Sequence, residues 1–254
     1  MIETFYQKLD IPEPCFLGQK IFKKLFYENA SFNSADKKAF TDDIDDIQWR
    51  YTLKPETINI PAFINQERDY SEVAIIQVNL KEIARYQRIA QIIQRTIPYP
   101  VLLIFYYKNQ MLLSVADKLI NQVDQEKIKV NDFYATDWID LQAPDQQEQD
   151  FINSFTIKHF SYQDFYAFYN DITACIIALN CAKLGGRYTL KTEISLEQRI
   201  EYLEAIRQSQ QKIQSLRTVL KKETQFNHKL NLNMQIKQLE QALAQDKQRV
   251  TANG

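Results

Sequence analysis

The last quarter of the chain carries a narrow stripe of aliphatic residues that only paired helices can bury. From Ser195 onward these residues recur at spacings of three, four and seven, and Gln, Lys and Glu fill most positions between them. This pattern is typical of a coiled-coil seam, and so narrow a stripe needs a partner in water. Its members are Leu196, Leu203, Ile206, Ile213, Leu216 and Leu220, followed after a break by Leu232, Ile236, Leu239, Leu243 and Val250.

The break in the stripe covers residues 224–231 and predicts a helical hairpin in place of one long rod. The two helices can cover the stripe by pairing with each other inside one chain. In the alternative, which we expect, the later helix also contacts another protein or a second copy of the chain, as a dimer. The residues predicted to make that contact are Leu232, Ile236, Leu239 and Leu243.

The rest of the chain has the pattern of an α/β (α+β) fold with a mixed sheet. Aromatic and β-branched residues predict strands at 47–53, 57–61, 71–80, 101–107, 111–117 and 130–136. Helical spacing or capping signals predict helices within 1–30, at 36–46 behind an N-cap at Ser34, and at 83–97. A polar linker at 142–150 and an aromatic-rich helical stretch at 151–184 follow. We therefore expect a sheet domain at 1–141, a linker and helical segment at 142–190, and the hairpin at 191–254.

Composition limits the classes of function. Hydrophobic residues make up 45% of the 254 residues, enough for a substantial core, and the formal net charge of −1 lacks the global basic field of strong nucleic-acid binders. Any contact with nucleic acid must therefore be local. Only four glycines occur, and Gly185 and Gly186 follow a predicted helix, which favours a helix C-cap and argues against a phosphate-binding loop.

Neither cysteine nor histidine forms a recognisable metal pattern. Cys15, Cys175 and Cys181 lack metal-type spacing and predict buried thiols, and His159 and His228 lie far apart. We expect no resident metal or cofactor. The first residues lack the apolar run of a signal peptide, and no stretch is apolar enough to span a bilayer, so the expected location is the cytoplasm without membrane contact.

Several local strings together resemble the bacterial domain-of-unknown-function 4391 family. They are KIFKKLFYENA, YTLKPETINI, RTIPYPVLLIF, TDWIDL and LKKETQFNHKLNLNMQIKQLE, and they extend over nearly the whole chain. The resemblance implies a genomic context beside helicases and DNA methyltransferases in restriction-like defence clusters. It implies no catalytic residues, because none are established for the family.

The order of the predicted helices and strands is similar to the order of elements in the core of PD-(D/E)-x-K nucleases. In those enzymes an acid opens the second strand, and a carboxylate-x-lysine on the third strand helps to hold Mg²⁺ and to steady the attacking water. Here Glu56 follows a proline at the second predicted strand, Lys81 ends the third, and Glu28 on the preceding helix is a possible extra acid. Asn79 stands where the second acid belongs, and an amide is a poor substitute for a carboxylate on a hard cation.

Basic side chains gather at two places where phosphate contact is possible. Lys20, Lys23 and Lys24 alternate with aromatic residues, and Arg85 and Arg88 lie on the central predicted helix. The alternative is an ordinary solvated face, which the acidic residues at 42–46 favour because they oppose an anionic partner.

Two hypotheses of different class follow. In the first, the chain is a non-catalytic accessory or scaffolding subunit of a helicase- or methyltransferase-linked defence system, acting through protein contacts and possible DNA contacts. In the second, it is a Mg²⁺-dependent DNA nuclease that uses Glu28, Glu56 and Lys81, in a degenerate form. A toxin- or antitoxin-like partner is a third reading that the residues leave open.

Overall fold

The computed structural model of the chain describes residues 1–120 and 128–251. The chain divides into two compact units, Met1–Ile176 and Ile177–Gly254, and each is described by itself. The first unit holds the sheet and most of the aromatic core, and the second holds the C-terminal hairpin.

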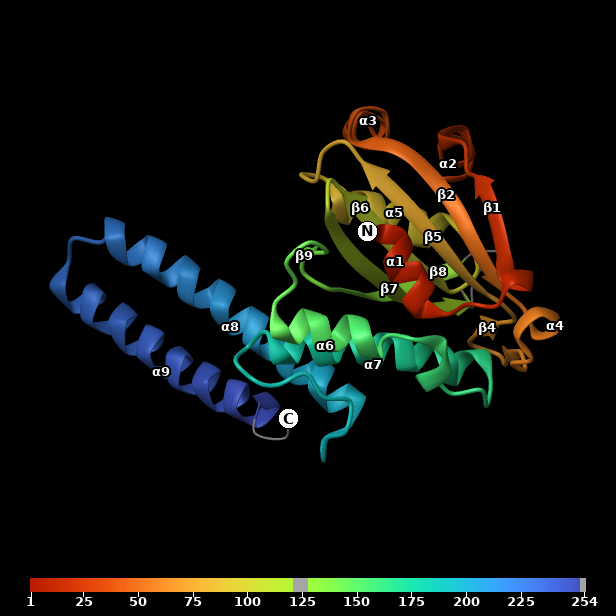
Figure 1. Ribbon diagram of the computed structural model, residues 1–254. Helices are drawn as coiled ribbons and strands as arrows, with labels where there is room; N and C mark the ends of the chain where they lie inside the picture. The colour runs from red at the N-terminus through yellow and green to blue at the C-terminus, as the bar shows by residue number, and fades with distance from the viewer. Residues whose placement is uncertain (121–127, 252–254) are drawn as a thin grey trace. The chain divides into compact units, whose positions relative to one another are not determined.

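A mixed sheet organises the first unit (Figure 1). Within the described residues, seven strands form it in the order β1-β2-β5-β6-β7-β8, with β9 also paired to β7. The parallel pair is β5 with β6, joined through helix α5 (Tyr86–Thr96), and the other pairs are antiparallel. The strands are β1 (Phe16–Lys20), β2 (Ile44–Leu53), β5 (Val73–Leu80), β6 (Val101–Tyr107), β7 (Gln110–Ile120), β8 (Ile128–Ala135) and β9 (Ile139–Asp140). A separate two-stranded ribbon pairs β3 (Phe63–Ile64) with β4 (Asp69–Tyr70).

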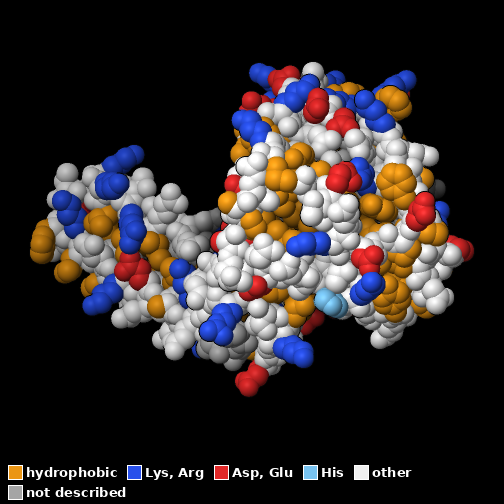
Figure 2. Space-filling model, in the orientation of Figure 1, with side chains coloured by type: hydrophobic (Ala, Val, Ile, Leu, Met, Phe, Trp, Pro, Cys, Tyr) orange, Lys and Arg blue, Asp and Glu red, His pale blue; other side chains and the backbone are white. Residues whose placement is uncertain are grey.

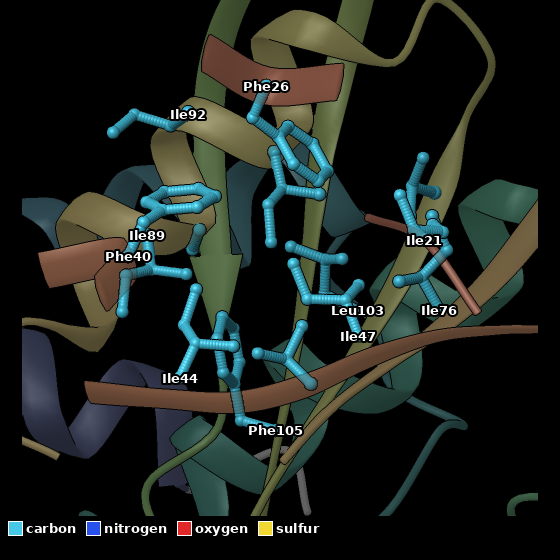
Figure 3. Close-up of a cluster of buried hydrophobic side chains, with 14 of the residues drawn as sticks. Ile21, Phe26, Phe40, Ile44, Ile47, Ile76, Ile89, Ile92, Leu103 and Phe105 are labelled. Atoms are coloured by element: carbon cyan, nitrogen blue, oxygen red, sulfur yellow. The ribbon is translucent and has the colours of Figure 1, made fainter. Parts of the chain in front are cut away.

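One face of the sheet is covered by α5, by α2 (Lys23–Asn29) and by the π-helical turn η2 (Ala39–Asp43). Phe26, Phe40 and Ile89 from these elements meet Leu103 and Phe105 of β6 in one buried cluster (Figure 3). Side chains alternate across a strand, so the intervening residues of β6 face the other side of the sheet.

That other face is covered by α1 (Ile2–Leu9), α6 (Gln146–Ser154) and the first turns of α7 (Phe165–Ala182). Phe5 of α1 stacks on Phe155, which follows α6, with ring centroids 5.9 Å apart. Tyr169 of α7 donates from its hydroxyl to the Val101 carbonyl at 2.8 Å. The sheet is therefore a middle layer between two helical layers, as a strand apolar on both faces such as β5 requires.

Several sequence-based element boundaries were wrong. The expected acidic helix at 36–46 is only α3 (Ser34–Lys38), capped by Asn33 and not by Ser34, and it continues into η2 before β2 begins. The expected strand at 57–61 is replaced by the single helical turn α4 (Pro55–Ile58). Strand β1 was not expected, because its sequence FLGQK contains a glycine and lacks alternation.

The predicted linker at 142–150 ends in a helix. The Asp145 carboxylate accepts from the Glu148 backbone N–H, and the Glu148 carboxylate accepts from the Asp145 backbone N–H. These two bonds form a capping box that starts α6. The remaining short elements of the first unit are the 3₁₀ turns η1 (Glu13–Cys15) and η3 (Ile157–His159).

The second unit contains a helical hairpin, α8 (Leu196–Lys222) and α9 (Phe226–Thr251), as the interrupted stripe predicts (Figure 1). Ser195 caps α8 through the Gln198 backbone, and the chain leaves helical geometry only over residues 223–225. Along the hairpin, the Arg217 guanidinium pairs with Glu240 at 2.6 Å.

Candidate functional site

The three residues of the nuclease hypothesis lie in different places. Glu56 belongs to α4, beyond the end of β2, whereas Lys81 follows the end of β5. The antiparallel register pairs Leu53 with Val73 at one end of these strands and Ile44 with Leu80 at the other. Glu56 and Lys81 are thus separated by the length of β5, about 23 Å at the usual rise per residue.

Glu28 does not complete such a site either. It lies on α2, is exposed, and pairs with Lys24 on the next turn at 3.4 Å. Helix α2 packs on the sheet face that α5 covers, and the side chains of Asn79 and Gln77 point to the opposite face, since their neighbours Ile76 and Val78 belong to the α5 cluster.

Because β1 precedes it, β2 is the second strand of the chain, and the acids that open it are Asp45 and Asp46. Asp46 is paired in register with Asn79, whose amide donates to the Asp46 carboxylate. Gln48 also donates to Asp46 at 2.6 Å, and Gln77 donates to Asn79 at 2.7 Å. A row of one carboxylate and three amides therefore crosses β2 and β5.

This row does not fit the magnesium site of a PD-(D/E)-x-K nuclease. Arg50 donates to Gln48 of the row at 3.5 Å, and Lys81 after the end of β5 pairs with Asp45 at 3.6 Å. Binding of Mg²⁺ in such enzymes depends on carboxylate ligands, whereas the residues of this row on β5 are the amides Gln77 and Asn79. Among the described residues, no group of three or more histidine, cysteine or acidic side chains is placed to hold a metal ion.

The two arginines predicted to contact phosphate are bound to buried acids of the same chain. Arg85 forms a two-pronged pair with Asp43, with Nε 2.7 Å from Oδ2, and Arg88 pairs in the same manner with Asp36 at 2.7 and 2.8 Å. Both carboxylates are almost fully buried. Hydrogen bonds from Arg88 lower the pKa of Asp36 below its usual range, although burial opposes this.

The predicted lysine cluster is also partly used by the fold. Lys23 donates to the Ile44 carbonyl at 2.7 Å, and burial lowers its pKa. Lys24 is engaged with Glu28, so Lys20 is the exposed member of the three for which the described residues supply no partner.

The residues predicted to bind a partner lie on the face of α9 turned toward α8. Ile236 is buried together with Ile206 and Ile213 of α8. Helical spacing places Leu232, Leu239 and Leu243 on the same face, and all three are half-buried. The hairpin thus closes on itself along this seam, as in the intramolecular alternative, and a contact of these four residues with another protein stays a prediction.

An apolar groove of about 510 Å³ opens at the β1 edge of the sheet. It is lined from three places: the end of β1 with α2, strand β2, and the connection between α5 and β6. The lining residues are Gln19, Lys20, Ile21, Phe22, Leu25, Asn29, Trp49, Thr96, Ile97, Pro98 and Tyr99. Phe22 is 70% exposed and Leu25 44% exposed, so large apolar surfaces stand open to solvent on the α2 side.

Strand β1 beside the groove is an edge strand whose five residues are all exposed. Its pairing with β2 shifts between Phe16 and Gln19, where Gly18 takes a positive φ of 63°. The positive φ of Gly18 favours glycine, and a Cβ there would also lie 2.7 Å from the tip of the Phe16 ring. This bulge leaves a short regular edge at Gln19 and Lys20, next to the groove.

A buried lysine fixes the backbone on the opposite side of the groove by hydrogen bonds. Lys118 of β7 donates from Nζ to the Ile97 carbonyl at 2.6 Å and to the Tyr99 carbonyl. Burial lowers the pKa of Lys118 well below its usual value, because the charged form loses its hydration there. The Trp49 and Tyr99 rings meet edge to face with centroids 6.4 Å apart. The groove wall is therefore held in place by the core and is preformed.

Comparison with family models matches residues 9–243 to the Domain of unknown function (DUF4391). The chain belongs to the DUF4391 family. No curated protein and no solved structure matches it. In this DUF4391 chain, the described helices are all too short or too polar to cross a membrane.

Sequence reasoning about this DUF4391 protein missed the groove. The signal available was Phe22 and Leu25 among the lysines of KIFKKLFYENA, a segment considered above only as a phosphate contact or a solvated face. Only Phe26 of that segment is fully buried, since α2 lies at the edge of the sheet and exposes its other apolar residues.

Proposed function

We propose that this chain is a non-catalytic accessory subunit that binds a partner protein through the groove at the β1 edge. The observation that carries the proposal is a preformed apolar groove lying directly beside an exposed strand edge. Apolar grooves with a few polar groups at the rim are the usual form of peptide-binding sites.

The occupant that fits is an extended segment of the partner with large apolar side chains. Phe22, Leu25 and Trp49 offer apolar and aromatic surface, of the kind that dominates binding energy at interfaces. Ile21 donates its backbone N–H to Ile47 of β2, so Gln19 also turns toward β2 and Lys20 faces the free edge. Main-chain hydrogen bonds to an added strand therefore contribute less than the side chains in the groove. The exposed Lys20 favours an acidic residue beside the apolar ones.

The family resemblance supports a partner class. If this protein works in a restriction-like defence cluster of a bacterial cytoplasm, the helicase or the DNA methyltransferase encoded beside it is the first partner to test. Such a subunit would position or stabilise its partner, and it would need neither a metal nor a cofactor of its own.

The test measures the affinity of the purified full chain for each of these two proteins by titration calorimetry. Leu25→Asp places a charge in the groove, and we expect it to weaken binding at least about tenfold, because an apolar contact is lost and a charge is desolvated. The matched control is Leu190→Asp, which changes an equally exposed leucine, 43% against 44%, in the other unit.

Two results would contradict the proposal. Equal binding by wild type and Leu25→Asp would remove the groove as the interface. Failure of both candidate partners to bind the wild-type chain at micromolar concentration would remove the proposed partner class.

A further inference from the structure

The turn of the hairpin concentrates positive charge in a chain that is acidic elsewhere. Residues 217–237 hold five cations against one anion, a local net charge of +4, whereas the whole chain has −1. The cations are Arg217, Lys221, Lys222, Lys229 and Lys237. Arg217 is engaged with Glu240, but the four lysines are exposed and the described residues provide no acid for them. In Figure 2, basic side chains (blue) and hydrophobic ones (orange) lie together over the end of the hairpin where α8 turns into α9.

An apolar stripe runs along the outer side of α9 from the same turn. Phe226, Leu230 and Met234 recur every four residues and are 77%, 53% and 56% exposed. They are turned away from the seam of Leu232, Ile236, Leu239 and Leu243, so they take no part in closing the hairpin. Lys237 continues this outer face three turns after Phe226.

Polar residues with carboxamide side chains flank the stripe, and their chemistry distinguishes a lipid surface from nucleic acid as the partner. Asn227 and Asn233 border Phe226 and Met234 on the outer side of α9, and the Asn233 amide already donates to the Lys229 carbonyl at 2.9 Å. In the acyl layer that the apolar stripe would enter at a lipid surface, the Asn227 amide would lose its hydrogen bonds to water without replacement. Phosphates, sugars and base edges supply donors and acceptors for them, so the mixture of lysine, carboxamide and an exposed aromatic ring fits nucleic acid.

We propose that the outer face of α9 and the adjoining turn bind a single strand of nucleic acid. Lys221, Lys222 and Lys237 contact its phosphates, and an unpaired base stacks on Phe226. A single strand is specified because the exposed phenyl ring needs a free base face, which the interior of a duplex does not present. This binding is independent of the groove at the β1 edge.

The test is fluorescence anisotropy of the full chain with labelled single-stranded DNA and RNA of about 20 nucleotides, longer than the site sizes of most such proteins. A duplex of the same sequence and vesicles of anionic phosphatidylserine are parallel arms. We expect single strands to bind more tightly than the duplex.

Phe226→Ala should weaken binding about tenfold by loss of stacking. The double variant K221E/K222E should lower the slope of log affinity against log salt by about 1.4, for two lost phosphate contacts.

Matched controls come from the sheet-bearing unit. Tyr162→Ala removes an exposed aromatic ring that lies outside the groove, and K37E/K38E makes the same charge change at two exposed lysines of α3. Both should bind the single strand as the wild type does. The proposal is wrong if no oligonucleotide binds at about 50 mM salt, where phosphate contacts are strongest. It is equally wrong if the duplex binds as well as the single strand, if the vesicles bind in preference, or if the controls weaken binding as much as the hairpin variants do.

Discussion

At the scale of single residues, the charged side chains of the sheet domain mostly serve the fold. Arg85, at the N-cap of α5, and Arg88 within α5 belong to the segment that sequence reasoning associated with phosphate, yet each neutralises an almost fully buried aspartate. A buried carboxylate without its partner is costly, so these arginines are not free to bind a ligand.

Arg88→Met should lower the free energy of unfolding by about 3 kcal/mol at neutral pH, because it leaves Asp36 buried and unpaired. The control is Lys24→Met, which breaks the exposed pair with Glu28 and should cost less than about 1 kcal/mol. Urea unfolding followed by tryptophan fluorescence measures both. Equal losses in the two variants would show that Asp36 does not depend on Arg88.

The same pair predicts a dependence on pH. Because Arg88 holds the folded-state pKa of Asp36 below its ordinary value of 3.8, the contribution of the pair is complete above that value and is lost as pH falls through the lowered pKa. In Arg88→Met, acidification relieves the buried charge, so the difference from wild type should shrink below about pH 4. A difference that stays constant from pH 7 to pH 3 would contradict this.

At the scale of elements, periodicity predicted the long helices and buried strands but not the short pieces. The stripe from Leu196 to Val250 correctly predicts two helices, and the apolar stretches correctly predict β5 and β6. The single turn α4 and the edge strand β1 carry too few residues for a period to show, and tertiary contacts decide their conformation.

Ile236→Ala should destabilise the hairpin by about 3 kcal/mol, since it leaves a cavity in the closed seam between α8 and α9. Leu230→Ala removes the same kind of side chain from the exposed side of α9 and should change stability by less than about 0.5 kcal/mol. Helicity at 222 nm during urea unfolding reports the loss. If the two variants behave alike, the seam is not the interior of the hairpin.

At the scale of the whole molecule, the arrangement of strands in the sheet keeps the residues of the predicted nuclease site far apart in space. Glu56 and Lys81 lie at opposite ends of β5, and the acid that faces Asn79 is Asp46. Sequence order placed Glu56 at the second strand because β1 was not recognised and because a strand was predicted at 57–61, where the chain forms the turn α4. Together these errors moved the expected acid by the length of a strand.

Incubation of the full chain with plasmid DNA and Mg²⁺ or Mn²⁺ should give no cleavage above the protein-free control, since one carboxylate beside three amides does not fit the required metal site. Asp46→Ala and Glu56→Ala should therefore leave the result unchanged. Cleavage by the wild type that Asp46→Ala abolishes would overturn the non-catalytic proposal and would assign the acid to Asp46.

The sequence by itself determined the features that depend on local spacing: the helical hairpin with its break, the buried strands, and a mixed α/β sheet domain. It also determined that charge on the hairpin turn differs in sign from the rest of the chain. The tertiary structure decided which strand became the edge, which face of α9 was left open, and which acids the arginines met. Arg88 and Asp36 are 52 residues apart, and Trp49 and Tyr99 meet only because β2, β5 and β6 are neighbours in the sheet. Local periodicity reflects the backbone of one element, whereas a groove or an ion pair depends on contacts between elements that are distant in the chain.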